Sequence, residues 1–335
     1  MATLEAFLEN DFLGTSAWFW LAFIGIVLFL LFLDLGVLHR KAHEIEMRES
    51  LLLYAGYFSV GVLFGGWVWL ELGTQRALEF YTGFLVEQSL SMDNVFVMAM
   101  IFSYFSIPRL YQHRVLFWGI LGVVVLRAIM IGIGSTLVQE FAWILYVFGA
   151  FLLVTGIKML FSREEAHPDL GNNPVLKFVR RHMRVTDDLH GPHFFVRLKA
   201  AGQHKAVLYA TPLFLALVLI ELADLVFAVD SVPAIFAITQ DPFIVYTSNI
   251  FAILGLRALY FALAALMHRF VYLKYALALV LIFIGCKIFY HGLIGAVPAL
   301  LSLGVTVALL SGGVVLSLLK TRDQPPQPVN SNSHK

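Results

Sequence analysis

The chain has 335 residues, of which 60% are hydrophobic and 13% are charged, about half the charged share of a typical soluble protein. Its mean hydropathy is +0.83. These values exclude an ordinary water-soluble domain and indicate an integral membrane protein. The formal net charge of +1 says nothing about partners, because the charges are unevenly placed. The single cysteine, Cys286, excludes a disulfide within the chain and a cysteine-cluster metal site.

Apolar windows of about 20 residues, long enough to cross a ~30 Å hydrocarbon core as a helix, recur along most of the chain. They predict an all-α fold, a polytopic bundle of about nine transmembrane helices. In chain order the expected spans are 17–38, 50–70, 80–102, 115–137, 142–161, 207–238, 243–266, 275–291 and 295–318. Residues 1–16 are expected to form an outer segment, and residues 320–335 a disordered tail.

Residues 162–206 form the one sizeable hydrophilic insert, and they carry eight Lys or Arg residues and five histidines. We expect a basic cytoplasmic loop with a helix around Leu176–Met183 that lies near anionic lipid headgroups. The alternative interpretation is a histidine-rich metal sensor, which the irregular spacing of the histidines disfavours.

The connecting segments differ sharply in charge. With the N-terminus outside, the inner loops and the tail hold eighteen Lys and Arg residues, and the outer loops hold only Arg76. This asymmetry predicts an outer N-terminus and a cytoplasmic C-terminus. Four basic residues remain within the expected spans: Arg127, Lys158, Arg257 and Lys287. The two lysines lie near span ends, where we expect them to snorkel toward the interface.

Three landmarks recur in the same order. The run Asp93-Asn94-Val95-Phe96 is followed 34 residues later by Arg127 in Leu-Arg-Ala, and Lys158 comes 31 residues after that. The run Asp224-Leu225-Val226-Phe227 is followed 33 residues later by Arg257, also in Leu-Arg-Ala, and Lys287 comes 30 residues further on. Each copy holds three spans, so the second copy must lie upside down in the membrane. Inverted repeats that meet at a midplane site are characteristic of secondary transporters.

The repeat divides the chain into units. The expected copies are 80–161 and 207–291, with two leading helices over 17–79 and a last helix over 292–319.

Five carboxylates fall inside the expected spans: Glu87, Asp93, Glu221, Asp224 and Asp230. A charge at the bilayer centre costs roughly 3 kcal/mol on insertion scales, so each must be offset by a partner or serve a function. Helical spacing predicts that Glu87, Ser91 and Asn94 share one stripe, and that Glu221 and Asp224 share a face with Ser231. These five acids are the predicted metal ligands.

Pro233 adds a feature to the second copy that the first copy lacks. It has no N–H for the carbonyl of Val229, and its ring crowds that carbonyl. We therefore expect the helix to kink or open around Asp230-Ser231, where a freed carbonyl would be a natural cation ligand. An alternative role for Asp230 is to cap the broken helix.

Carboxylate, amide, hydroxyl and backbone oxygens favour hard cations such as manganese, magnesium or calcium. Neighbouring carboxylates raise one another's pKa, so protons could replace the metal. The structural alternative is that Arg127 and Arg257 pair with the acids and merely hold the bundle together. Ser248 and Asn249 either line the ion path or make a helix–helix hydrogen bond. No tightly bound cofactor and no nucleic-acid partner are expected.

The sequence resembles the TerC/Alx family of integral membrane proteins, and it looks closest to the Alx branch. The resemblance covers roughly residues 17–318. It rests on Glu87-Gln88-Ser89-Leu90-Ser91-Met92-Asp93-Asn94-Val95-Phe96, Phe148-Gly149-Ala150-Phe151-Leu152, His193-Phe194-Phe195-Val196, the stretch Glu221 to Pro233, and Thr247-Ser248-Asn249-Ile250-Phe251-Ala252-Ile253-Leu254-Gly255-Leu256-Arg257. It implies a nine-helix protein of the bacterial inner membrane, related to cation exporters, with manganese efflux as the expected activity. The metal's identity and the export direction come from the resemblance alone.

Two functions follow as hypotheses. The first is a manganese exporter that exchanges the ion for protons, with Asp93 and Asp224 as the main ligands. The second is a membrane scaffold without transport activity, active in tellurite or envelope stress or in membrane-protein insertion, which would use the basic loop. A hydrolase is disfavoured, because the acids have no His-Glu-x-x-His or serine–histidine arrangement.

Overall fold

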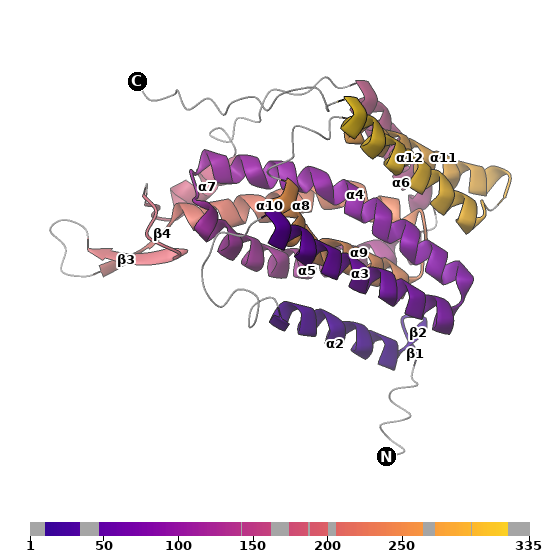
Figure 1. The fold of residues 1–335 in the computed structure, drawn as a ribbon, viewed down its shortest axis with the longest axis horizontal. Helices are drawn as coiled ribbons and strands as arrows, with labels where there is room; N and C mark the ends of the chain where they lie inside the picture. The colour runs from indigo at the N-terminus through magenta and orange to yellow at the C-terminus, as the bar shows by residue number, and fades with distance from the viewer. Residues whose placement is uncertain are drawn as a thin grey trace, which may run out of the picture.

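The structure, a computed structural model, describes residues 11–33, 47–141, 143–161, 174–186, 188–199, 206–263, 272–295 and 297–320. Its helices are α2 (Ala17–Leu33), α3 (Met47–Leu72), α4 (Thr74–Tyr104), α5 (Arg109–Glu140), α6 (Ile144–Phe161), α7 (Pro174–His182), α8 (Pro212–Phe236), α9 (Pro242–Leu254), α10 (Leu256–Leu263), α11 (Leu273–Leu293) and α12 (Ala299–Lys320). Two antiparallel hairpins complete it: β1 (Asp11–Phe12) with β2 (Thr15–Ser16), and β3 (Phe195–Lys199) with β4 (Ala206–Ala210). The bundle is helical as expected (Figure 1).

Six of the described helical segments are long and apolar enough to cross a membrane: α3, α5, α6, α8, the α9–α10 segment and α12. The apolar α2 is shorter, with 17 residues. The expected spans 80–102 and 275–291 coincide with α4 and α11. Large apolar side chains on the outer helices are exposed, among them Leu63, Val154 and Leu300. Helices that are apolar on their exposed face suit a lipid environment, so the chain is a multi-pass membrane protein, and the count of nine stays a prediction.

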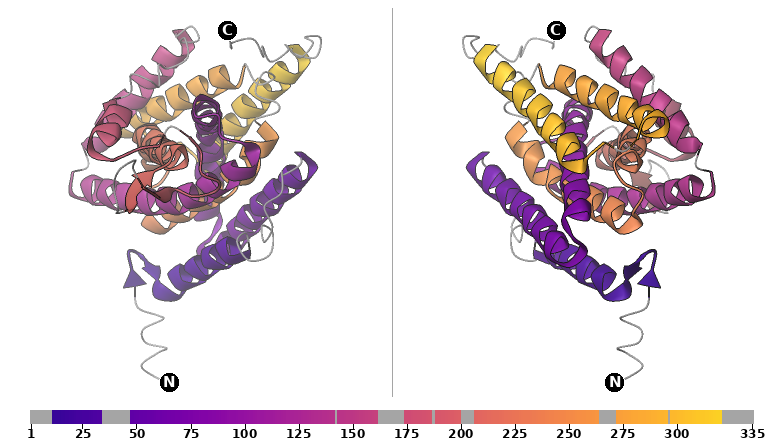
Figure 2. Two further views of the ribbon diagram at one scale, coloured as in Figure 1. Left: turned by 90° about the vertical axis from the view of Figure 1, so that its left-hand side faces the viewer. Right: turned by 90° about the vertical axis from the view of Figure 1, so that its right-hand side faces the viewer.

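The helix α9 lies inside the bundle, where all of its residues from Thr247 to Leu254 are buried. The indigo helices α2 and α3 lie along one side of the bundle (Figure 2). Both α4 and α5 pack against α8 and α9, while α6 packs against α11. A polar residue on α4, α5, α8 or α9 can therefore reach the others without meeting lipid.

The pairing of α6 with α11 depends on glycines. A Cβ atom added at Gly156 would lie 2.8 Å from the carbonyl oxygen of Ala278, and one added at Gly285 would lie 2.8 Å from that of Gly149. Small residues let backbones approach closely inside membranes, where apolar side chains gain little by leaving lipid. These glycines fix α6 and α11 as a tight pair beside the centre.

The expected span 207–238 is wrong at its start. Residues 206–210 form β4 and pair in register with β3, from Phe195 opposite Ala210 to Lys199 opposite Ala206. The helix α8 begins only at Pro212, after the extended Thr211. Proline suits the first turn of a helix, where its missing N–H costs no hydrogen bond. The apolar residues Ala206–Ala210 thus belong to a hairpin.

Of the kink or opening expected around Asp230-Ser231, the opening is wrong, because α8 runs through both residues with Pro233 inside it. The kink stays a prediction. One helix later, Gly255 marks the boundary between α9 and α10, but its backbone is helical (φ −74°, ψ −18°) and residues Pro242–Phe261 remain one candidate span.

The expected basic helix of the hydrophilic insert is confirmed as α7. It packs against α8 at the end of the bundle where the β3–β4 hairpin projects (Figure 1). The described basic residues of this insert therefore gather at one end of the molecule.

Candidate functional site

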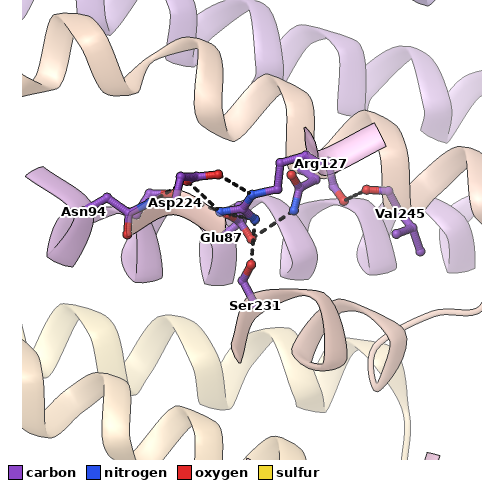
Figure 3. A network of polar contacts seen from close by, with 9 residues as sticks. Glu87, Asn94, Arg127, Asp224, Ser231 and Val245 are labelled. Atoms are coloured by element: carbon purple, nitrogen blue, oxygen red, sulfur yellow. Dashed lines mark hydrogen bonds and ion pairs between the residues drawn. The ribbon is translucent and has the colours of Figure 1, made fainter. Parts of the chain in front are cut away.

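The side chain of Arg127, on α5, lies at the centre of a buried polar network and is only 1% exposed. Its Nε donates to Asp224 Oδ2 (3.2 Å) and its Nη2 to Asp224 Oδ1 (3.2 Å). Its Nη1 donates to Glu87 Oε1 (2.7 Å) and to Ser231 Oγ (2.6 Å). Figure 3 shows the guanidinium between the two carboxylates, with Ser231 beside it. Four of its five N–H groups are thus directed at oxygens on α4 and α8.

Both carboxylates of this network accept hydrogen bonds from other side chains as well. Glu87, on α4, accepts from Ser91 Oγ (3.3 Å) and from Asn249 Nδ2 (3.0 Å) on α9. Asp224, on α8, accepts from Asn94 Nδ2 (2.9 Å). With the bonds from Arg127 included, each carboxylate accepts three hydrogen bonds, which compensate for its removal from water.

The stripes expected from helical spacing are present. Glu87, Ser91 and Asn94 are all buried on the face of α4 that meets the network. Asp224 and Ser231 share the face of α8 that contacts Arg127. The predicted Arg–Asp pairing is formed by Arg127 and Asp224, which belong to different copies of the proposed repeat.

The carboxylate of Glu221 is held differently. It lies on α8, one turn before Asp224, and packs against α5 at Gly122, where an added Cβ atom would overlap its Oε1. Both oxygens are inaccessible to solvent, and neither has a hydrogen-bond partner among the described residues. Only a glycine at position 122 leaves room for this carboxylate. Sequence reasoning missed Gly122; its one signal is the Gly119-Ile-Leu-Gly122 spacing on a helix that also carries Arg127.

Two further buried oxygens of the network lack partners within the described structure. Asn94 and Asn249 each donate from Nδ2 to a carboxylate, and each leaves its Oδ1 without a hydrogen bond. Ser248, in contrast, donates to the carbonyls of Ile244 and Val245 on its own helix. Of the two neighbours expected to line a path, Asn249 joins the network and Ser248 packs at the contact of α9 with α4.

Three predicted site residues cannot be placed relative to this network. The side chains of Asp93, Asp230 and Arg257 lie outside the described part of the structure. Among the residues that are described, no three His, Cys, Asp or Glu side chains gather as a metal would require. Of the five predicted ligands, Glu87 and Asp224 form an ion-pair network around Arg127, and Glu221 beside it has no partner among the described residues.

This arrangement has a definite charge. With both acids ionised, Glu87, Asp224 and Arg127 sum to one negative charge, and an ionised Glu221 would make two. Buried charge without compensation is costly, so the region favours the binding of a proton or a cation. The acceptors without partners are all oxygens, which are the ligands of hard cations.

Comparison with known proteins gives consistent relatives. An uncharacterised membrane protein of Rickettsia bellii is 48% identical over 301 residues, covering 90% of this chain and 97% of that protein. A protein of Escherichia coli K12 named "putative membrane-bound redox modulator Alx" is 48% identical over 299 residues, covering 85% of this chain and 89% of its own. An uncharacterised membrane protein of Myxococcus xanthus is 46% identical over 307 residues, covering 91% of this chain and 93% of that protein.

No solved structure matches the chain. Residues 72–325 match the profile described as the integral membrane protein TerC family, and this stretch includes α4 to α12 and the whole polar network. The chain therefore belongs to the TerC family of integral membrane proteins, as its acidic motifs led us to expect.

Proposed function

We propose that the protein is a divalent cation transporter of the bacterial inner membrane that exports manganese, with protons as the counter-ion. It would act as a carrier without chemistry of its own, and manganese(II) would be its cargo. The observation that carries the proposal is Glu221: a carboxylate inside an apolar helix, shielded from water, with no hydrogen-bond donor among the described residues. A group in this state favours any cation that can reach it.

The ion-pair network beside Glu221 supports the proposal. Arg127 is already bound by Asp224 and Glu87, so it does not neutralise Glu221 as well. The neighbouring Asp224 adds negative potential at Glu221. A divalent ion or protons at Glu221 would relieve this excess, with amide oxygens such as Asn94 Oδ1 as neutral ligands. Asp93 and Asp230 stay predicted further ligands. That the ion is manganese follows from the family resemblance alone.

The packing of the helices supports the proposed inverted repeat. In that repeat α4 corresponds to α8, α5 to α9 with α10, and α6 to α11. A twofold axis that exchanges these helices turns the α5–α8 contact into the α9–α4 contact, and it maps the α4–α8 and α6–α11 contacts onto themselves. All four contacts are among the most extensive in the bundle. We propose nine spans, six of them related in this way, with the N-terminus outside and the C-terminus in the cytoplasm.

The transport proposal is tested by manganese movement in everted membrane vesicles, where export appears as uptake. Wild type should accumulate manganese, and Glu221→Gln, Asp93→Asn and Asp224→Asn should each lose most of that uptake. Glu140→Gln, which neutralises an exposed carboxylate at the end of α5, is the matched control. Unchanged transport in Glu221→Gln would contradict the ligand assignment. The proton role fails separately if metal movement neither dissipates a pH gradient nor responds to one.

A second candidate function rests on the cytoplasmic end as we orient it. Arg180, Arg181 and Arg184 line a hollow of about 580 Å³ with Tyr209 of β4, and cation transport does not use it. A scaffold would recruit an acidic partner there. Replacing the three arginines with glutamine keeps the hairpin intact, and it should abolish partner capture if the protein is a scaffold but leave manganese flux unchanged if it is a transporter.

A redox role such as the one in the name of the Escherichia coli relative would need redox groups that this chain does not supply as a pair of thiols. The 335 residues contain one cysteine, Cys286, so thiol–disulfide exchange within the chain has no second sulfur. A redox function would therefore depend on a partner or on the redox chemistry of the transported metal.

A further inference from the structure

A cavity of about 500 Å³ opens at the end of the bundle opposite α7 and the β3–β4 hairpin. It lies where α4 begins, α8 and α11 end and α12 begins. Its polar lining comes from Gln75, Glu79, Thr82, Thr239, Gln240, Lys287 and Ser302. In the proposed orientation, which places the basic loop in the cytoplasm, this is the outer end.

The cavity approaches the buried network along two helices. On α4, Glu79 lies eight residues before Glu87, or about 12 Å along the axis at 1.5 Å per residue. On α8, the lining residue Phe236 lies five residues after Ser231, or about 8 Å. The cavity therefore lies on the outer side of the network, and its lining residues on these two helices end about one to two turns short of it.

Two opposite charges face this cavity. Gln75 Nε2 donates to Glu79 Oε1 at 2.7 Å and so orients that carboxylate. Lys287 is half-buried, and its Nζ contacts Ser302 Oγ at 3.4 Å. The Glu79 carboxylate interacts electrostatically with the Lys287 ammonium. Lys287 thus does not simply snorkel to the surface, as its position near a span end suggested, because its ammonium lies in the lining of a cavity.

We propose that this cavity is the outer vestibule of the cation path, that Glu79 is the carboxylate of its lining that an exported divalent cation meets, and that the Lys287 ammonium competes with the cation for Glu79. The inference rests on the proposed transport function and extends it to the release step. A metal ion leaving the network passes Glu79, and the fixed ammonium of Lys287 lowers the occupancy of that site. Release is then favoured and re-entry from outside opposed.

The electrostatic part of the inference can be tested without transport. In a Cys286→Ala background, Gln240→Cys places one thiol on the exposed rim of the cavity. Two membrane-impermeant methanethiosulfonate reagents of similar size, one anionic and one cationic, are applied from outside the cell. Lys287→Gln should lower the anionic-to-cationic rate ratio about fivefold, as expected for unit charges about 8 Å apart in water. Glu79→Gln should raise that ratio, and Lys287→Arg should leave it unchanged.

The functional part is tested in proteoliposomes with manganese added on the outer face. External manganese should inhibit export by occupying the site at Glu79. Lys287→Gln should lower the external manganese concentration that gives half-maximal inhibition about fivefold, and Lys287→Arg should behave as wild type. An unreactive thiol in the Gln240→Cys variant, or a rate ratio insensitive to both charge changes, overturns the vestibule. If wild type exports manganese but Lys287→Gln is inhibited like wild type, the competitor role is overturned. If wild type exports nothing while the labelling responds as described, the proposed function fails and the charged cavity stands.

Discussion

Asp224 and Glu221 lie one helical turn apart on the same side of α8, but their hydrogen-bond partners differ. Asp224 accepts three hydrogen bonds, two from Arg127 and one from Asn94. Glu221 accepts none from the described residues and rests against the bare backbone of Gly122. The first carboxylate holds α8 on α4 and α5, whereas the second has no hydrogen-bond partner in the part of the chain that the structure describes. Spacing along a helix does not distinguish these roles, because the facing helix decides them.

Arg127→Met should remove the ion pairs of Asp224 and Glu87, and it should have the largest effect on stability. It leaves Glu87 and Asp224 buried without a cation, and breaking a buried pair in this way costs about 3–5 kcal/mol. We expect a strongly lowered melting temperature in detergent and poor accumulation in the membrane. The triple variant Arg127→Met, Glu87→Gln, Asp224→Asn should recover much of that stability. A melting temperature equal to wild type in the single variant would show that the network does not hold the helices.

Asp224→Asn and Glu221→Gln should separate the two roles directly. Asp224→Asn turns an amide N–H₂ toward the donors of Arg127, and it should cost about 2–3 kcal/mol, as expected when hydrogen bonds to a charged group are lost. Glu221→Gln loses no protein hydrogen bond seen in the structure, so stability should change by less than about 1 kcal/mol. Thermal melts and vesicle uptake on the same preparations make the comparison. Equal destabilisation by both variants would contradict the distinction.

Sequence reasoning reached the components of this site but not their partners. Carboxylates in apolar runs, and the three- and four-residue steps from Glu87 to Asn94, were sufficient to predict which faces are buried and polar. They could not show that Arg127 binds Asp224 and Glu87 and leaves Glu221 free, since that choice depends on how α5 crosses α8. The decisive residue there is Gly122, which makes its contribution by lacking a side chain, so no chemical signature marks it.

The errors in the fold have similar causes. Hydropathy extended the sixth span back to residue 207, because Ala206–Ala210 is as apolar as the helix that follows. Only pairing with β3, a contact between distant residues, makes it a strand. Likewise Pro233 indicated an opening by a local rule that neighbouring helices can override in a membrane. Composition and helical period predict which segments are helices, whereas breaks and hairpins are decided by tertiary contacts.

Gly122→Ala should affect Glu221 and leave Asp224 unchanged, because the added Cβ atom crowds only the carboxylate of Glu221. A Cβ at this position would overlap the carboxylate carbon and both oxygens of Glu221, so the side chain must shift. Overpacking of this kind costs about 1–3 kcal/mol, and transport should fall with it. Gly119→Ala is the matched control, since its Cβ would lie 3.8 Å from the same carboxylate, an ordinary contact. Combining Gly122→Ala with Glu221→Ala should restore stability but not transport, and equal effects of the two glycine variants would contradict this packing.

Ser91→Ala should cause the smallest loss of stability among these variants. Ser91 Oγ donates to Glu87 Oε1 over 3.3 Å, which is long for a hydroxyl bound to a carboxylate, and the same oxygen already accepts from Arg127 at 2.7 Å. We expect a loss of about 0.5–1 kcal/mol, less than a well-formed hydrogen bond to a charged group provides. Asn249→Ala removes the donor to the other oxygen, Oε2, at 3.0 Å, and should cost more. Melting temperatures of the two variants in the same detergent give the order, and a larger loss for Ser91→Ala would mean that Glu87 depends on its own helix more than on α9.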